Sequence, residues 1–441
     1  MDKLIITGPS QLKGKIRVSS SKNSSLPIMV ATLLSENIVT INNLPKLRDV
    51  STMLKLLKNL GAEIEEKDDG KVVFNTCKLN SYEANYEMVK TMRASFLVIG
   101  PLLARYGKAS VSLPGGCAIG ARSIDIHLDG LAKLGAEIDL RGGYVHASAK
   151  KLKGAEILLS FPSVGATENL MMCASLAEGT TVIKNAAREP EIIDLANFIN
   201  KMGGHVYGAG TSDITIEGVK SIRTEVDYID YNVIPDRIEA STYIIAGIIT
   251  NSHIVVENVI TKHMDAIFDV LKNMGANFKI ISPEKNINNA HANENDIVEI
   301  FPRVEGVELK GIHVDTAPYP GFPTDVQAQL MALALSANSP SVITEHIFEN
   351  RFMHVPELNR MGANILLKGN SAFIEGNTKL TAAPVMCTDL RASAALILAA
   401  LVAECETEIC RVYHLDRGYE FIDRKLTNLN VLVKRVPGGP F

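Results

Sequence analysis

The sequence predicts an α/β protein of two domains, each built from three copies of one helix–strand unit. The chain has 441 residues, whereas a single hydrophobic core usually stops growing at about 250–300 residues. A helix-like segment that ends in Leu/Met-Gly-Ala/Gly recurs along the whole chain, and strand-like residues follow each copy. A second segment of small and aliphatic residues recurs between these copies. The alternation of helix and strand signals is typical of an α/β fold.

The first repeated element is a helix that ends at a glycine, or once at an asparagine. Its six copies end at Gly61, Gly135, Gly203, Gly275, Gly362 and Asn430. Glycine, and less often asparagine, accepts the left-handed conformation that closes a helix. The residues that follow each of these positions in the sequence are rich in strand formers, so a strand is expected after each helix.

The second repeated element is a helix that is apolar on nearly all sides. Its copies begin NSSLPIMVATLL, ASFLVIGPLLA, ATENLMMCASLA, EASTYIIAGII, DVQAQLMALAL and RASAALILAALVA. Such helices are expected inside each domain, whereas the helices that end at glycine are amphipathic and cover the core. The longest apolar run, 392–403, is shorter than the roughly 20 residues that span a bilayer, so it is predicted to be a buried helix. The domain boundary is predicted near residues 226–236.

Composition narrows the range of functions. The net charge is −4, from 45 basic and 49 acidic residues, so no global field favours nucleic acid or an anionic membrane. The six cysteines show neither a CxxC pair nor the spacing of metal ligands, which predicts no metal site and a reducing cytoplasm. Four of them, Cys77, Cys173, Cys405 and Cys410, are predicted to be small core residues.

Positive side chains recur at the predicted helix starts, where the helix dipole disfavours them. One series precedes the amphipathic helices and comprises Arg48, Arg122, Arg188, Lys262, Arg351 and Arg417. The other precedes the apolar helices and comprises Lys22, Arg93, Thr167, Arg237, Asp325 and Arg391. Arginine offers a planar fork that suits phosphate and carboxylate. The pattern therefore predicts an anion site to which helix starts of both domains contribute.

The two positions that lack a cation are informative. Asp325, in FPTDVQAQ, places a carboxylate where its counterparts are cations, so it is either a general base or a counter-ion. Thr167, in SVGATENL, either belongs to a helix cap or helps to hold a phosphate.

One cysteine differs from the others in its surroundings. Cys117 lies in LPGGCAIGARS, a glycine-rich segment suited to a mobile lid. A thiol close to Arg122 can act as a nucleophile or a proton donor. The alternative is an incidental thiol in a flexible loop.

Together these segments resemble a known family. SKNSSLP, TMRAS, LPGGCAIGARSIDIH, SVGATEN, PDRIE, FPTDVQAQ, ENRFMHVPELNRMGA, TDLRASAALILA and DRGYE are similar, in order, to the UDP-N-acetylglucosamine 1-carboxyvinyltransferase family of enolpyruvyl transferases. The resemblance implies an inside-out α/β barrel in each of two domains, with three helix–strand repeats per domain. It implies an N-terminal domain of residues 22–232, a C-terminal domain of residues 1–21 plus 233–441, and an active site in the cleft between them.

The resemblance also implies a reaction. The enolpyruvyl group of phosphoenolpyruvate passes to the 3-hydroxyl of UDP-N-acetylglucosamine with release of phosphate, the first committed step of peptidoglycan synthesis, without any cofactor or metal. Cys117 is then the proton donor and the target of fosfomycin, Asp325 the base, and Lys22 and Arg417 are catalytic. The residues implied for phosphoenolpyruvate are Lys22, Asn23, Arg122, Arg351, Arg391 and Arg417. Those implied for the UDP-sugar are Arg93, Arg122, Ser123, Ile124, Asp125, Ile126, Ser163, Val164, Gly165, Asp325 and Ile347.

Two departures and two rival functions accompany this expectation. Phe161 stands where many relatives carry a lysine, which removes a cation from the nucleotide side, and Asn430 replaces the sixth glycine. An enolpyruvylshikimate-phosphate synthase would share the fold and the reaction type. A non-catalytic protein that senses the UDP-sugar would share only the binding site.

Overall fold

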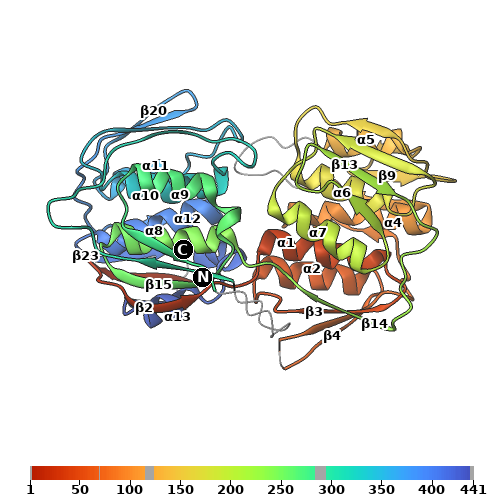
Figure 1. Cartoon of the computed structure of the whole chain (residues 1–441), viewed down its shortest axis with the longest axis horizontal. Helices are drawn as coiled ribbons and strands as arrows, with labels where there is room; N and C mark the ends of the chain where they lie inside the picture. The colour runs from red at the N-terminus through yellow and green to blue at the C-terminus, as the bar shows by residue number, and fades with distance from the viewer. Residues whose placement is uncertain (1, 69, 115–123, 284–294, 438–441) are drawn as a thin grey trace. The chain divides into compact units, whose positions relative to one another are not determined.

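The computed structural model describes residues 2–68, 70–114, 124–283 and 295–437. The chain forms two compact units, which we describe separately (Figure 1). Unit 1 contains the residues up to Ser19 and the residues from Pro235 onward, and unit 2 contains the described residues from Ser20 to Ile234. Within the described residues, the chain passes from one unit to the other at Ser19–Ser20 and at Ile234–Pro235.

The described residues form six four-stranded sheets that share one strand order. In each sheet the first strand runs parallel to the second. The third strand pairs antiparallel with the second, and the fourth pairs antiparallel with the third. The sheets of unit 2 are β14 (Tyr228–Asn232), β3 (Ile38–Asn42), β5 (Val72–Asn75) and β4 (Glu63–Glu66); β6 (Glu83–Ala84), β7 (Lys108–Ser112), β9 (Tyr144–Ser148) and β8 (Glu137–Arg141); and β10 (Glu156–Leu158), β11 (Thr180–Lys184), β13 (Asp213–Glu217) and β12 (His205–Tyr207). Those of unit 1 are β2 (Lys13–Arg17), β15 (His253–Val259), β17 (Asp296–Ile300) and β16 (Phe278–Ile281); β18 (His313–Asp315), β19 (Ser341–Thr344), β21 (Ser371–Ile374) and β20 (Ile365–Lys368); and β22 (Val385–Met386), β23 (Cys405–Cys410), β1 (Asp2–Gly8) and β24 (Leu432–Pro437).

Strands from distant parts of the sequence close each unit. In unit 2 the last strand, β14, pairs with the first, β3, with Tyr228 opposite Ile38. In unit 1 the N-terminal strand β2 lies beside β15, with His253 opposite Lys13 (Figure 1), and β1 lies between β23 and β24. The first 17 residues thus complete two sheets of unit 1.

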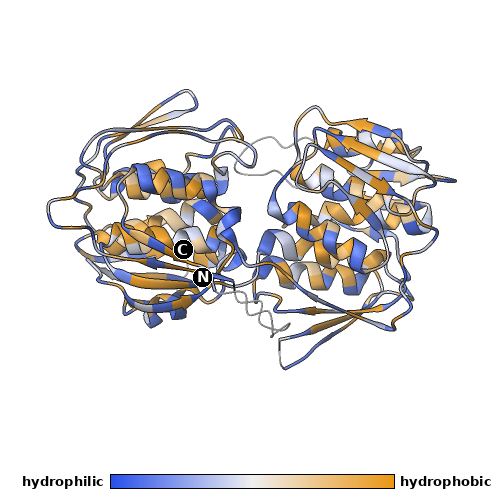
Figure 2. Cartoon of the chain, in the orientation of Figure 1, coloured by the Kyte–Doolittle hydropathy of each residue, from blue (hydrophilic) through white to orange (hydrophobic). Residues whose placement is uncertain are grey.

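The helices lie in the interior of each unit and the sheets lie around them. The buried helices are α1 (Lys22–Ala31), α4 (Ile99–Tyr106) with the preceding 3₁₀ helix η2 (Arg93–Val98), and α6 (Val164–Ala174) in unit 2, and α8 (Arg237–Ile249), α10 (Thr324–Ala334) and α12 (Leu390–Val402) in unit 1. Figure 2 shows these helices as mostly hydrophobic, as their sequences predict. Many of the strands alternate between buried and more exposed residues, as in β14, because one face of each sheet meets the helices and the other meets water. The predicted inside-out α/β class is confirmed.

The amphipathic helices end as the sequence predicts. They are α2 (Arg48–Asn59), α5 (Asp125–Lys133), α7 (Pro190–Lys201), α9 (Asp265–Asn273), α11 (Val355–Arg360) and α13 (Ile422–Asn428), with a short helix α3 (Tyr86–Val89) besides. All six predicted cap positions have positive φ, from 67° at Asn430 to 101° at Gly61. At Gly203 a Cβ atom would lie 2.5 Å from the carbonyl oxygen of Arg223, so this cap requires glycine for space as well as conformation.

Two of the predicted core cysteines are on the surface. Cys173 is buried, but Cys77 and Cys405 are exposed and Cys410 is half-buried, so the prediction is wrong for Cys77 and Cys405. Cys77 lies in the turn after β5, and Cys405 begins β23 with a φ of 74°. Residue type suggested burial, whereas Cys77 lies in a turn and Cys405 opens a strand with a left-handed backbone conformation. Within the described ranges, no helix is long and apolar enough to cross a membrane.

Candidate active site

In unit 1, three charged residues from separate elements form one cluster, which we call the acid–arginine cluster: Asp325, Arg351 and Arg391. Asp325 lies in the first turn of α10, and Arg391 lies in the first turn of α12. Asp325 Oδ1 accepts a hydrogen bond of 2.7 Å from Arg351 Nη2, and its Oδ2 accepts one of 3.3 Å from Arg391 Nη2. The side chains of Arg351 and Arg391 are 4% and 3% exposed, whereas that of Asp325 is 27% exposed. Two nearly buried cations therefore meet at one carboxylate that water or a substrate can reach.

Arg391 remains charged despite its burial. Burial opposes the positive charge, but Asp325 and further acidic groups outweigh it and hold the pKa of Arg391 above its usual value. Its guanidinium carbon lies 5.8 Å from the centre of the Tyr419 ring. Asp389 caps α12 by accepting the backbone N–H groups of Arg391 and Ala392, which orients the first turn of the helix.

A buried polar network supports α10 behind this cluster. Gln329, one turn after Asp325, donates Nε2 to the hydroxyl oxygens of Thr242 and Tyr419, at 3.3 Å each. The two hydroxyl groups lie 2.9 Å apart. The network ties α10 to α8 and to the segment after η4 (Val412–Arg417). The helix that carries Asp325 is thus tied to two neighbouring elements of unit 1.

Two further expected residues of unit 1 lie in other elements. Ile347 is half-buried in the turn after β19, and its backbone N–H donates to the carboxylate of Glu345 at 2.7 Å. Arg417 ends η4 and is half-buried. Phe348, next to Ile347, places its ring centre 5.4 Å from the guanidinium carbon of Arg351, which connects this turn to the acid–arginine cluster.

In unit 2, Lys22 and Asn23 open helix α1. Ser21 caps the helix by accepting the backbone N–H of Ser24. Lys22 Nζ lies 3.5 Å from Asp49 Oδ2, and the side chains are 13% and 6% exposed. Because Asp49 begins the neighbouring helix α2, this ion pair connects the two helix starts.

A second group of expected residues in unit 2 lies at the start of α5. Ile124, Asp125 and Ile126 directly precede His127 in the sequence, and His127 is buried in this helix. Burial, together with the charge of Arg93, lowers the pKa of His127 to about 3. Asn169 Nδ2 lies 3.1 Å from His127 Nδ1, so the two buried side chains are within hydrogen-bonding distance. A Cβ atom at Gly165 would lie 3.3 Å from His127 Cε1 and 3.5 Å from Nε2. Glycine therefore lets the start of α6 approach this ring.

The residues at the start of α6 have structural roles that the sequence left open. Ser163 caps the helix by accepting the backbone N–H of Ala166, and Val164 begins it. Thr167 is fully buried, and its hydroxyl oxygen accepts the backbone N–H of Ala187 at 3.0 Å. Thr167 therefore braces the connection to α7 and does not hold a phosphate. Phe161, which stands where many relatives are expected to carry a lysine, is 42% exposed.

The sequence predicts the charged residues of the site but not the polar residues that support them. Asn169, Gln329, Tyr419 and Glu345 were not predicted. An amide inside an otherwise apolar helix, as at Asn169 and Gln329, was the available signal, because such a group must find a partner when it is buried. Cys117, Arg122 and Ser123 lie outside the described residues. Among the residues that are described, no three His, Cys, Asp or Glu side chains are grouped so as to hold a metal ion.

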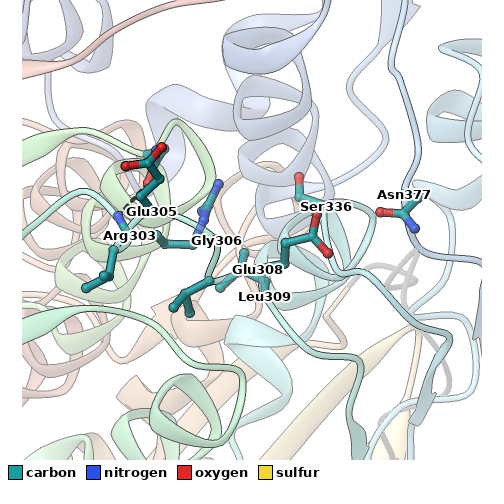
Figure 3. A pocket seen from close by; sticks show the side chains of 10 residues that line it. Arg303, Glu305, Gly306, Glu308, Leu309, Ser336 and Asn377 are labelled. Carbon is teal, nitrogen blue, oxygen red and sulfur yellow. Dashed lines mark hydrogen bonds between the residues drawn. The ribbon is translucent and has the colours of Figure 1, made fainter.

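A hollow elsewhere in unit 1 is separate from these clusters. It has a volume of about 270 Å³ and is lined by Arg303, Glu305, Glu308, Ser336 and Asn377, among others (Figure 3). Arg303 is held there by a 3.0 Å hydrogen bond from Nη1 to the carbonyl oxygen of Ile248. None of the expected site residues lines this hollow.

Comparison with known proteins identifies the family. A family model described as EPSP synthase (3-phosphoshikimate 1-carboxyvinyltransferase) matches residues 6–426. This chain belongs to the enolpyruvyl transferase family. Among its relatives in the family, a UDP-N-acetylglucosamine 1-carboxyvinyltransferase from Geotalea uraniireducens is 53% identical over 438 residues, with 99% of this chain and 100% of the relative covered. A protein of the same name from Geobacter metallireducens is 52% identical over 443 residues, with the same coverage.

Solved structures of enolpyruvyl transferases share the fold. The enolpyruvyl transferase NikO from Streptomyces tendae matches with a TM-score of 0.86 at 23% identity, covering 99% of each chain. EPSP synthase from Acinetobacter baumannii matches with a TM-score of 0.76 at 19% identity, covering 99% of this chain and 100% of that chain. At these identities the likeness establishes the inside-out α/β architecture of the enolpyruvyl transferases and nothing about substrate.

Proposed function

We propose that this chain is a UDP-N-acetylglucosamine 1-carboxyvinyltransferase. It transfers the enolpyruvyl group of phosphoenolpyruvate to the 3-hydroxyl of UDP-N-acetylglucosamine, releases phosphate, and so begins peptidoglycan synthesis. The observation that carries this proposal is the 53% identity to a relative of that name across 99% of the chain. We place the reaction in the cytoplasm, because all cysteines of the described residues are free thiols.

The acid–arginine cluster suits the acceptor half of the reaction. The sugar hydroxyl must lose a proton as it attacks, and Asp325 is the carboxylate that can take it. The two guanidinium groups orient this carboxylate and stabilise its charge, at distances of 2.7 and 3.3 Å. The carboxylate of phosphoenolpyruvate needs the same kind of donor. In this proposal it competes with Asp325 for Arg351 and Arg391, and each bond that Asp325 gives up makes it a stronger base.

The donor half of the reaction requires a proton and anion binding. Cys117 delivers its thiol proton to the methylene carbon of phosphoenolpyruvate, and the neighbouring carbon gains positive character. The sugar oxygen bonds to that carbon while Asp325 takes the hydroxyl proton. In the tetrahedral adduct the Cys117 thiolate then takes a proton from the new methyl group, the bond between carbon and the phosphate oxygen breaks, and the double bond is restored as phosphate leaves. Lys22, Asn23, Arg122 and Arg417 bind the phosphate in this scheme, because the departing group gains negative charge.

The UDP-sugar is proposed to contact the residues that the family resemblance implies. They include Arg93, Arg122, Ser123, Ile124, Asp125 and Ile126, together with Asp325 and Ile347. The first residues of α6, Ser163 to Gly165, present backbone N–H groups at a helix N-terminus, which suits a diphosphate.

Release of inorganic phosphate tests the proposal. Purified protein is incubated with phosphoenolpyruvate and with UDP-N-acetylglucosamine, with shikimate 3-phosphate, or with no acceptor. We expect phosphate only with the UDP-sugar. Phosphate only with shikimate 3-phosphate would identify an enolpyruvylshikimate-phosphate synthase. Binding of the UDP-sugar without phosphate release would instead identify a binding protein.

A further inference from the structure

Glu345 is a buried carboxylate that the proposed reaction does not use. It follows strand β19, and its side chain is 4% exposed. Among the described residues no cation pairs with it. Instead, its two oxygens accept four hydrogen bonds from uncharged donors: the Thr316 and Thr324 hydroxyl groups and the backbone N–H groups of Ile347 and Phe348. Burial of a carboxylate is costly unless such donors replace water, so these bonds define one arrangement of the surrounding chain.

The donors lie on segments that also carry proposed site residues. Thr324, bonded to Oε2 at 2.8 Å, directly precedes Asp325 at the start of α10. This helix start has Pro323 as its cap residue, with no side-chain hydrogen bond. The Glu345–Thr324 bond therefore anchors this end of α10 in addition to the bonds that Asp325 accepts from Arg351 and Arg391.

The other oxygen organises the turn that follows β19. Oε1 accepts the N–H groups of Ile347 at 2.7 Å and Phe348 at 3.1 Å. It also accepts the Thr316 hydroxyl at 2.8 Å, and the oxygen of that hydroxyl accepts the N–H of His346 at 2.9 Å. Three successive backbone N–H groups of this turn are thus held by Glu345 or by its partner. Phe348 lies against the guanidinium group of Arg351, which in turn binds Asp325.

We propose that Glu345 is a positioning residue that couples the catalytic base to the UDP-sugar site. One oxygen fixes the start of α10 and with it Asp325. The other fixes the turn that carries Ile347. Glu345 contacts neither substrate, and this inference rests on the function proposed above.

Kinetics of matched variants test the coupling. In Glu345→Gln one carboxylate oxygen becomes an amide NH₂, which cannot accept a hydrogen bond, and the other oxygen loses its charge. The bonds on both the Thr324 side and the turn side are therefore lost or weakened. We expect kcat to fall about tenfold or more, because small displacements of a reacting group reduce rates steeply. We expect the KM and the calorimetric Kd for UDP-N-acetylglucosamine to rise about fivefold or more, with the KM for phosphoenolpyruvate within about twofold of wild type.

Substitutions of the donors separate the two branches. Thr324→Val removes only the bond beside Asp325, so kcat should fall while the Kd for the UDP-sugar stays within about twofold. Thr324→Ser keeps the hydroxyl and should restore kcat. Thr344→Val is the matched control, because it removes a buried hydroxyl of β19 that is bonded to Ser371 of β21 and makes no hydrogen bond to the Glu345 carboxylate.

Three results would overturn the coupling: unchanged kinetics in Glu345→Gln, equal losses in Thr324→Ser and Thr324→Val, or losses as large in Thr344→Val. The calorimetric arm separates this inference from the proposed function. A wild-type chain that binds the UDP-sugar without releasing phosphate would refute the function, while the Kd of Glu345→Gln would still decide the role of Glu345. A chain that does neither would refute both proposals.

Discussion

The substitution Asp325→Asn separates the two roles that Asp325 can have, general base and counter-ion. Asparagine keeps one acceptor oxygen and nearly the same shape, but it carries no charge and cannot take a proton from the sugar hydroxyl. If Asp325 is the base, turnover at saturating substrate should fall by about 10²- to 10⁴-fold. If it is only a counter-ion, the main effect should be on stability.

The stability effect follows from the geometry of the acid–arginine cluster. Asp325 accepts charged hydrogen bonds of 2.7 and 3.3 Å from Arg351 and Arg391, which are 4% and 3% exposed. Removal of one partner of a buried ion pair costs about 3–5 kcal/mol, but Asp325 is 27% exposed and asparagine still accepts one bond. We therefore expect a loss of about 2 kcal/mol in the free energy of unfolding. For domains of this size that corresponds to a Tm lowered by about 4–8 °C.

The assay combines phosphate release at 25 °C with thermal and urea unfolding of the same samples. Asp296→Asn serves as the control, because Asp296 also accepts side-chain bonds, from Thr261 at 2.5 Å and Ser282 at 2.7 Å, outside the cluster. We expect the control to lose stability and keep its turnover. An Asp325→Asn protein that turns over within about tenfold of wild type would refute the assignment as base. Unchanged stability would refute the electrostatic argument.

Three more predictions follow from individual residues. Cys117→Ser should slow turnover severely while the Kd for UDP-N-acetylglucosamine stays within about twofold, and fosfomycin should alkylate Cys117; mass spectrometry that finds the adduct elsewhere would contradict this role. Arg417→Ala should lower kcat/KM about 10²-fold or more, because several kcal/mol of transition-state stabilisation are lost. A loss below about tenfold would show that Arg417 lies outside the anion-binding site. Burial lowers the pKa of His354 to about 4 against the nearby carboxylate of Asp389, so between about pH 4 and 6.5 the unfolded chain binds a proton there that the folded chain does not. The free energy of unfolding thus decreases as the pH falls through this range. In His354→Gln its dependence on pH, measured by urea unfolding, should be weaker by about 1.4 kcal/mol per pH unit. An unchanged dependence would contradict the argument from burial.

Local signals predicted the repeated architecture well. The positions at Gly61 through Asn430 were found from a short pattern, because a helix cap with positive φ selects glycine or asparagine through backbone sterics alone. The buried helices are recognisable from their apolar composition, because most positions in the interior of each unit are occupied by apolar side chains. The same local reasoning failed for Cys77 and Cys405, where the course of the chain, not the residue type, determines exposure.

The charged residues of the site were predictable for the opposite reason. A cation at a helix start is locally unfavourable, so its recurrence indicates a purpose beyond the helix. That Arg351 and Arg391 both bind Asp325, however, depends on three elements meeting in space. Nothing in the spacing of 325, 351 and 391 contains that information.

What the sequence determined by itself is the set of groups and the ends of the helices that present them. Only the tertiary structure decided which groups meet, because hydrogen bonds at 3 Å between residues far apart in the chain depend on the packing of whole helices. Glu345 illustrates this difference. In the sequence it is one glutamate among many, and it becomes a point of convergence only because β18, α10 and the turn after β19 bring their donors to its carboxylate.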